Sequence, residues 1–89
     1  MYSIKIEQNA ERFLKKISKQ DKKIILNKIY SLRQDPFRFL KRLKGHKLWR
    51  LRVLKYRVIV DVIISRKSII VLRIGYRKKV YKWCFGDYD

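Results

Sequence analysis

The sequence lacks the features on which secreted and membrane proteins depend. Its one cysteine, Cys84, cannot form a disulfide within the chain, which excludes the class of disulfide-rich secreted domains. No apolar run approaches the roughly 20 residues needed to span a bilayer, and the first residues do not resemble a signal peptide. We therefore expect a cytoplasmic protein with no membrane partner.

Proline and glycine are scarce as well. One proline and three glycines are spread over 89 residues, and no repeat or low-complexity segment marks a linker. The chain is shorter than the roughly 100–200 residues of a typical domain. We therefore predict a single domain that covers residues 1–89.

Acidic residues are few. Asp and Glu number 7 against 25 Lys and Arg, a formal net charge of +18, which favours a polyanionic partner. Residues 38–82 contain 16 basic residues and one acidic residue, so they hold a net +15 of this charge. Because 47% of the residues are hydrophobic, the composition indicates a folded protein and not a disordered basic tail.

The first part of the chain carries one strand signal and two helix signals. Residues 2–7 alternate apolar and polar side chains, as in a strand with one buried face. Asn9 can cap a first helix, and Ser18, with Asp21 three residues later, can cap a second helix that ends at Pro36. Cations on the helices are expected to form an ordinary solvated surface. The second helix is expected to bury a stripe of Ile24, Ile25, Ile29 and Leu32.

Three short segments rich in β-branched and aromatic residues follow. Residues 48–53, 56–63 and 69–74 are separated by gaps short enough for an antiparallel meander. The link Leu54-Lys55 lacks the glycine or asparagine that a two-residue hairpin turn favours, so we expect a longer or bulged loop. The order strand, two helices, three strands predicts an α+β fold in which two helices pack on one face of a small antiparallel sheet.

Side-chain parity in these strands groups the arginines. Because residues two apart point to the same face of a strand, Arg50 and Arg52 share one face, opposite their apolar neighbours. In the next strand Arg57 opposes three valines, and in the last strand Arg73 is expected to share its face with Val71. One register places all four arginines on one face, where planar guanidinium groups suit phosphate binding, and leaves the other face to the helices.

Few residues could support catalysis through a metal or a nucleophilic side chain. The 7 acidic residues form no clear pair, and His46 and Cys84 have no companions for a zinc site, so we expect no metal and no cofactor. Phosphoryl transfer within RNA needs neither, because the 2′-hydroxyl attacks the adjacent phosphate while protein groups move protons and stabilise charge. Arg77, flanked by Tyr76 and Tyr81, follows the last strand and can serve such a reaction. The Tyr81 ring could equally pack against the core or stack on a base.

An ordered set of short motifs resembles one toxin family. The motifs are Leu43-Lys44-Gly45, residues 49–53 (Trp-Arg-Leu-Arg-Val), residues 56–59 (Tyr-Arg-Val-Ile) and residues 73–81 (Arg-Ile-Gly-Tyr-Arg-Lys-Lys-Val-Tyr). Together they resemble the RelE branch of the RelE/ParE toxin superfamily over nearly the whole chain. The resemblance implies a metal-independent endoribonuclease of a type II toxin–antitoxin system, which cleaves mRNA in the ribosomal A site by 2′-hydroxyl attack and so inhibits translation. It also implies a hetero-oligomeric complex with an acidic RelB-like antitoxin, beside the ribosome and mRNA as partners.

The resemblance further implies roles for individual residues. The implied catalytic set is Arg50, Arg52, Arg57, Arg77 and Tyr81. The first three clamp phosphates and stabilise the transition state, Arg77 acts as general acid or charge stabiliser, and Tyr81 stacks on a base or accepts a proton. The remaining RNA-binding residues are expected to be Arg73, Lys44, Lys47, Lys78, Lys79 and Tyr76.

The chain departs from the family pattern in two places. Well-studied RelE proteins have lysines where this chain has Arg50 and Arg52, and an arginine with a pKa above about 12 cannot act as a neutral base. A base role therefore passes to Tyr81 or disappears. The spacing from Arg77 to Tyr81 is also shorter than in some members, so Tyr88 can stand in for Tyr81.

Two other functions stay open on the sequence alone. A ParE-like poison of DNA gyrase would have the same fold, although such proteins generally lack the terminal Arg and Tyr pair that Arg77 and Tyr81 form here. A basic RNA-binding protein without catalytic activity would account equally well for the charge.

Overall fold

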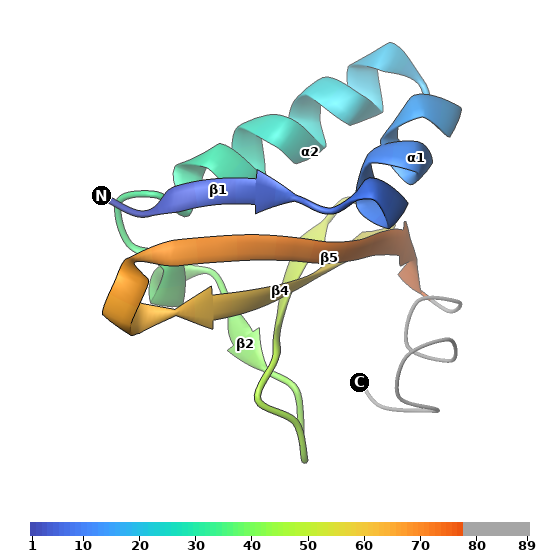
Figure 1. The fold of residues 1–89 in the computed structure, drawn as a ribbon. Coiled ribbons are helices and arrows are strands. Elements are labelled where there is room, and N and C mark those ends of the chain that lie inside the picture. Colours follow the sequence, from blue (N-terminus) through green and yellow to red (C-terminus); the bar gives the residue numbers. More distant parts are fainter. Residues whose placement is uncertain (78–89) are drawn as a thin grey trace.

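The computed structural model describes residues 1–77 (Figure 1). Its elements, in chain order, are β1 (Ser3–Ile6), α1 (Gln8–Lys16), α2 (Lys19–Ser31), the 3₁₀ turn η1 (Pro36–Arg38), β2 (Lys41–Arg42), β3 (Trp49–Val53), β4 (Tyr56–Ile63), the 3₁₀ turn η2 (Ile64–Arg66) and β5 (Ser68–Tyr76). No helix in residues 1–77 is long and apolar enough to cross a membrane.

The strands form one sheet in the order β1-β5-β4-β3-β2, and both helices pack on the same face of it (Figure 1). The predicted α+β arrangement is therefore confirmed. The pairs β3–β4 and β4–β5 are antiparallel as predicted. The short strand β2, which was not predicted, pairs antiparallel with β3. Strand β1 pairs with β5 in parallel, from Ser3↔Ser68 to Ile6↔Val71. The sheet is mixed because all the elements between β1 and β5 act as the long connection that a parallel pair requires.

The two helices differ in how they begin. Ser18 caps α2 as predicted, since its Oγ accepts a hydrogen bond from the backbone N–H of Asp21 at 3.1 Å. The prediction for Asn9 is wrong, because Glu7 is the N-cap of α1 and Asn9 lies within the helix. Helix α2 ends at Ser31, earlier than predicted, and Pro36 instead opens the turn η1.

The hydrophobic core lies between the helices and the sheet. Of the predicted stripe on α2, three residues are fully buried, but Ile24 is 37% exposed. The buried residues of the core are Ala10, Leu14, Ile25, Ile29, Leu32, Leu40, Leu51, Val53, Tyr56, Val58, Val60, Ile69, Val71 and Ile74. Full burial of one such large apolar side chain contributes about 1.5–3 kcal/mol, so this layer holds the helices on the sheet.

A β-bulge changes the parity of β5. Ile59 of β4 pairs with Arg73 while Val60 pairs with Val71, so Leu72 is the extra residue of the bulge. Val71 was predicted to share the face of Arg73, and this prediction is wrong. Ile69 and Val71, before the bulge, lie in the core on the same side as Ile74, which follows it. After the bulge, Arg73 returns to the face opposite the helices.

The connection between β3 and β4 is a two-residue turn. Val53 pairs directly with Tyr56, so Leu54 and Lys55 form the whole loop, and the expectation of a longer or bulged loop is wrong. Leu54 adopts φ 54°, a left-handed conformation that costs a residue with a Cβ atom about 1–2 kcal/mol. The strand pairing on both sides of the turn fixes this conformation.

Candidate nucleic-acid interface

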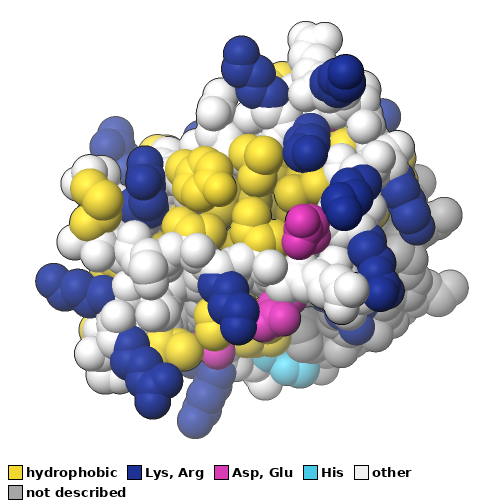
Figure 2. All heavy atoms as spheres, turned by 45° about the horizontal axis from the view of Figure 1, so that its top comes forward, with side chains coloured by type: hydrophobic (Ala, Val, Ile, Leu, Met, Phe, Trp, Pro, Cys, Tyr) yellow, Lys and Arg dark blue, Asp and Glu magenta, His cyan; other side chains and the backbone are white. Residues whose placement is uncertain are grey.

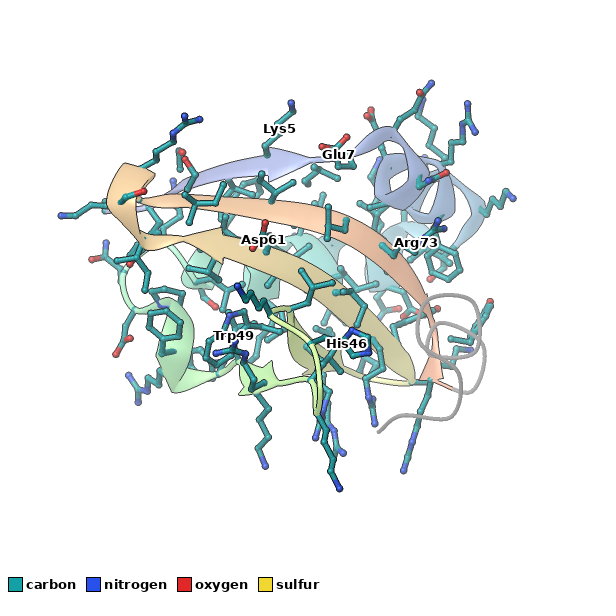
Figure 3. The ribbon with its side chains drawn as sticks, turned by 60° about the horizontal axis from the view of Figure 1, so that its bottom comes forward. Lys5, Glu7, His46, Trp49, Asp61 and Arg73 are labelled. Carbon is teal, nitrogen blue, oxygen red and sulfur yellow. The ribbon has the colours of Figure 1, made fainter. Side chains whose placement is uncertain are left out.

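The strand pairing places the predicted arginines on the sheet face opposite the helices. Figure 3 views the molecule from this side and labels Arg73. Residues paired across neighbouring strands point to the same face. One row across the sheet runs through Lys41, Arg50, Ile59 and Arg73, and a second row runs through Arg52, Arg57 and Gly75. Neighbouring strands lie about 4.8 Å apart, so each row is a ladder of closely spaced positions. We call Arg50, Arg52, Arg57 and Arg73 the arginine face.

A short loop folds over part of this face. Leu43 and Ile59 form a second, small buried cluster against which Leu48 packs. The loop is closed by two backbone hydrogen bonds, from Leu43 N to the Leu48 carbonyl at 2.9 Å and from His46 N to the Leu43 carbonyl at 3.1 Å. Gly45 has φ +79°, where a Cβ atom would be strained.

The loop brings two predicted RNA-binding lysines beside the arginine face. Lys44 and Lys47 are both exposed. Arg42 Nε donates a hydrogen bond to the His46 carbonyl at 3.1 Å, which ties the loop to β2. His46 lies in this loop (Figure 3) and is half-buried.

The four arginines of the face differ in exposure. Arg52 is exposed, Arg50 and Arg73 are half-buried, and Arg57 is only 2% exposed. Arg57 Nη1 donates to the carbonyl of Tyr56 at 3.2 Å. In this conformation the guanidinium group of Arg57 lies beneath the surface. The predicted clamp role would require this group to be exposed to a phosphate in solvent.

An aromatic cluster lies at the end of β5. The ring of Tyr76 lies 5.4 Å from the rings of Phe13 and Tyr56, yet Tyr76 is 41% exposed. Lys55 Nζ lies 5.7 Å from the centre of the Tyr76 ring. Tyr76 therefore has one supported side and one accessible side, as its predicted contact with RNA bases requires.

Tyr56 is a structural residue of this cluster. Its hydroxyl donates a 2.6 Å hydrogen bond to Asp21 Oδ2. This hydrogen bond, together with burial and the charge of Asp21, raises the pKa of Tyr56 from 10.0 to about 12. Tyr56 thus keeps its proton near neutral pH and is not a candidate base. No local sequence pattern indicates this bond, because its partners are 35 residues apart.

Arg77 is exposed and directly follows β5. Its backbone N–H donates to the Lys55 carbonyl at 3.1 Å, which places it beside the β3–β4 turn. The other predicted residues of this region, Lys78, Lys79, Tyr81 and the stand-in Tyr88, lie outside the described residues. The part of the chain that the structure describes contains no group of three or more His, Cys, Asp or Glu side chains able to hold a metal ion.

Solved toxin structures have the same fold as this chain. The archaeal RelE–RelB complex of Pyrococcus horikoshii is 27% identical, with a TM-score of 0.77, and the alignment covers 89% of this chain and 98% of that chain. The toxin–antitoxin complex RelBE2 of Mycobacterium tuberculosis is 20% identical, with a TM-score of 0.76 and coverage of 85% and 98%. The isolated RelE toxin of Escherichia coli is 18% identical, with a TM-score of 0.73 and coverage of 93% and 94%.

The sequence itself matches one family model. No curated protein matches the sequence. The model that matches, over residues 4–81, describes the ParE toxin of the type II toxin–antitoxin system parDE. The matched residues include every described element of the sheet and both helices except Ser3, the first residue of β1. The chain therefore belongs to the RelE/ParE superfamily of toxins from type II toxin–antitoxin systems.

Proposed function

We propose that this toxin is a ribosome-dependent, metal-independent endoribonuclease that cleaves mRNA in the ribosomal A site. The observation that carries the proposal is the strand register, which aligns arginines from three strands on one face. Arg77 follows directly at the end of β5. A cationic face of fixed geometry, bordered by an exposed tyrosine, suits a single RNA strand whose phosphates and bases are both held.

The proposed reaction uses the RNA's own nucleophile. The 2′-oxygen forms a bond to the adjacent phosphorus, the bond from phosphorus to the 5′-oxygen breaks, and the products are a 2′,3′-cyclic phosphate and a 5′-hydroxyl. One proton leaves the 2′-hydroxyl and one reaches the leaving 5′-oxygen. Arg50 and Arg52 hold the phosphate, and Arg57 adds charge from below, where a low dielectric strengthens its effect.

Arg77 has the role most specific to cleavage. Because a guanidinium group keeps its charge at neutral pH, Arg77 stabilises the extra negative charge of the transition state and does not act as the base. The base role is proposed for Tyr81, in the part of the chain outside residues 1–77. In this assignment the arginine face and the Tyr76 ring bind the RNA strand, and Arg77 and Tyr81 act on the bond that is broken.

An acidic antitoxin is the proposed partner that silences the toxin in a hetero-oligomeric complex. The Pyrococcus horikoshii and Mycobacterium tuberculosis relatives are toxin–antitoxin complexes. In this chain a hollow of about 390 Å³ between β1, α1 and α2 is lined by Ile4, Ile6, Leu14, Leu26 and Tyr30, with Lys15, Lys22 and Glu11 around them. Figure 2 shows apolar side chains gathered on this side of the molecule among Lys and Arg residues. Such a surface suits an amphipathic acidic segment.

A second candidate function is poisoning of DNA gyrase, because the matching family model describes ParE toxins. The two functions predict different damage. A gyrase poison would cause persistent DNA breaks and leave mRNA intact, whereas the nuclease would cut mRNA and leave DNA intact.

The deciding experiment adds the purified toxin to translating ribosomes and maps mRNA 5′ ends. We expect cuts confined to A-site codons. Arg77→Ala should abolish these cuts and leave ribosome binding nearly unchanged, because the arginine face is intact. The matched control is Arg33→Ala, which changes an exposed arginine after α2. This variant should cleave mRNA as the wild type does. Absence of A-site cuts by the wild type would overturn the nuclease proposal, and DNA breaks in its place would support the gyrase alternative.

A further inference from the structure

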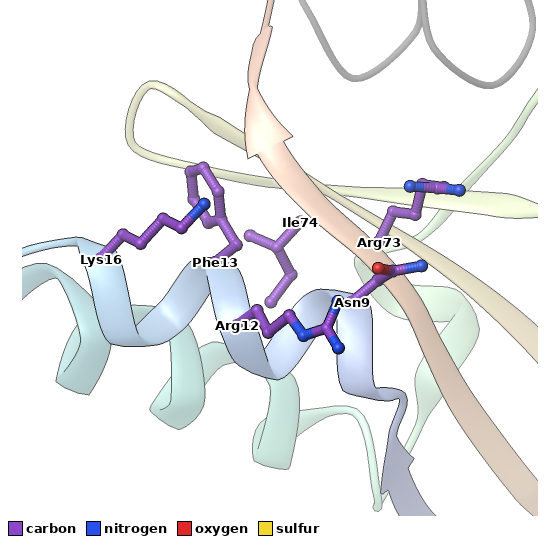
Figure 4. Close-up of a pocket in the computed structure, with 6 residues that line it drawn as sticks. All are labelled: Asn9, Arg12, Phe13, Lys16, Arg73 and Ile74. Atoms are coloured by element: carbon purple, nitrogen blue, oxygen red, sulfur yellow. The ribbon is translucent and has the colours of Figure 1, made fainter.

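The edge of β5 is open beyond the end of β1. The last pair between the two strands is Ile6↔Val71, so the following residues of β5 are not covered by β1. Helix α1 lies along this part of β5. Between them is a hollow of about 220 Å³, lined by Asn9, Arg12, Phe13, Lys16, Arg73 and Ile74 (Figure 4).

Among residues 1–77, three cations and no carboxylate line this hollow. Arg12 and Lys16 are four residues apart on α1, so they lie on the same helix face, where like charges repel. Glu11 of the same helix lines the other hollow, between β1 and α2. Within residues 1–77, Arg12, Lys16 and Arg73 form no ion pair. The arrangement therefore costs folding stability and is best balanced by a bound anion.

The hollow is continuous with the arginine face. Arg73 belongs to both, since it is the last cation of the row that starts at Lys41 and Arg50. Three strand spacings of about 4.8 Å separate Lys41 from Arg73, so this row spans about 14 Å. Ile59 lies between Arg50 and Arg73 in this row and is buried against Leu43, so a strand of RNA on the face passes over the loop that carries the exposed Lys44 and Lys47 before it reaches Arg73 and the hollow.

The side chains of the hollow also suit a nucleotide. Figure 4 shows Asn9, Arg12, Phe13 and Lys16 on α1 facing Arg73 and Ile74 on β5, so the cations and the Phe13 ring line the same hollow. The Phe13 ring is supported by Tyr76, whose ring centre is 5.4 Å away. Cations beside an aromatic ring are the combination with which proteins grip single-stranded nucleic acid.

We propose that Arg12 and Lys16 of α1, with Asn9 and Arg73, form a second RNA-backbone site. It holds a phosphodiester of the same single strand that lies on the arginine face, at a distance from the bond that is cleaved. The identification of this strand as mRNA rests on the proposed function. The site extends the interface from the sheet around the edge of β5 and onto helix α1.

The test compares two double variants that remove the same charge. Arg12→Gln/Lys16→Gln empties the hollow of its helical cations. Lys19→Gln/Lys23→Gln removes two exposed cations with the same spacing from α2 and is the control. Fluorescence anisotropy measures the affinity for 2′-O-methyl RNA of about three and about nine nucleotides at several salt concentrations. Thermal unfolding confirms that each variant is folded.

We expect the wild type and the control to bind the longer RNA more tightly than the shorter one. The Arg12→Gln/Lys16→Gln variant should lose most of this gain. Because the site holds one phosphodiester, and each neutralised phosphate contributes about 0.7 to the salt slope for single strands, the slope of this variant with the longer RNA should fall by about 0.7. A fall equal to that of the control would overturn the proposal. The proposal would also be overturned if the Arg12→Gln/Lys16→Gln variant bound an acidic peptide more weakly and bound RNA as the wild type does. That result would identify the hollow as a contact for a protein partner.

This test is independent of the cleavage assay. RNA with 2′-O-methyl groups has no free 2′-hydroxyl and cannot be cut, so its binding reports only on contacts. If the wild type fails to cut mRNA on ribosomes and the hollow still binds RNA, the proposed function fails and the RNA site stands. If cleavage is observed and the salt slope of the Arg12→Gln/Lys16→Gln variant equals that of the control, the proposed function stands and the second RNA site is overturned.

Discussion

At the scale of single residues, Asp21 joins helix α2 to the sheet. Its backbone N–H donates to Ser18 Oγ at 3.1 Å, which caps the helix, and its carboxylate accepts a hydrogen bond from the Tyr56 hydroxyl at 2.6 Å. The cap could be predicted because its partners are neighbours in the sequence. The Tyr56 bond could not, because it depends on where β4 passes beneath α2.

Tyr56→Phe should destabilise the fold by about 1.5–3 kcal/mol, the usual range for a hydrogen bond to a charged group. Since folding raises the pKa of Tyr56 to about 12, the bond stabilises fully below about pH 10, the pKa of an unfolded tyrosine. This stabilisation is lost as the pH rises through 12. Urea unfolding should therefore show that the free energy of unfolding of the wild type exceeds that of Tyr56→Phe by a gap that is constant up to about pH 9. This gap should shrink above about pH 10. Tyr30→Phe, at an exposed tyrosine, is the control, and a gap that does not shrink would contradict the assignment.

At the scale of elements, the β3–β4 turn and the bulge in β5 show where pattern rules fail. Parity along β5 predicted Arg73 and Val71 on one face, but Leu72 is an extra residue and separates them. Such a bulge depends on the pairing with β4, so no local pattern within β5 reveals it. The turn at Leu54 is likewise imposed by the pairing of Val53 with Tyr56, against the preference of the residue itself.

Leu54→Gly should stabilise the protein by about 0.5–1 kcal/mol. Glycine adopts φ 54° without the strain of a Cβ atom, and this gain exceeds its greater freedom in the unfolded chain. Leu54 is 57% exposed, so little packing is lost. For a chain of this size we expect Tm to rise by about 2–8 °C. Lys55→Gly is the control, since Lys55 does not have a positive φ, and it should leave Tm unchanged or lower. A lower Tm for Leu54→Gly would show that the turn is not strained.

At the scale of the whole molecule, charge opposes folding and favours binding. The net charge is +18, and folding into a compact body brings these like charges close together, which destabilises the folded state. The sheet fixes these charges in rows and so prevents them from moving apart. The same repulsion that weakens the free toxin is relieved when RNA or an acidic partner binds.

The free toxin should therefore become more stable as salt is added. Raising NaCl from about 0.1 M to about 1 M shortens the Debye length from about 10 Å to about 3 Å, which screens the repulsion between exposed cations. We expect Tm to rise by several degrees, measured by circular dichroism. In a complex with an acidic antitoxin the same addition should raise Tm less or lower it, because salt then screens attraction as well. A Tm of the free toxin that falls with salt would contradict this account.

The sequence by itself determined the class of fold, the two helices on one face, the cap at Ser18 and the alternation that sets the arginines of β3 and β4 opposite the core. These features follow from residues close together in the chain, whose spacing fixes the side on which each side chain lies. Only the tertiary structure decided the parallel pairing of β1 with β5, the bulge that returns Arg73 to the arginine face, the burial of Arg57 and the approach of α1 to the edge of β5. Each of these depends on contacts between segments distant in sequence, which form where the packing of the sheet and helices brings them together.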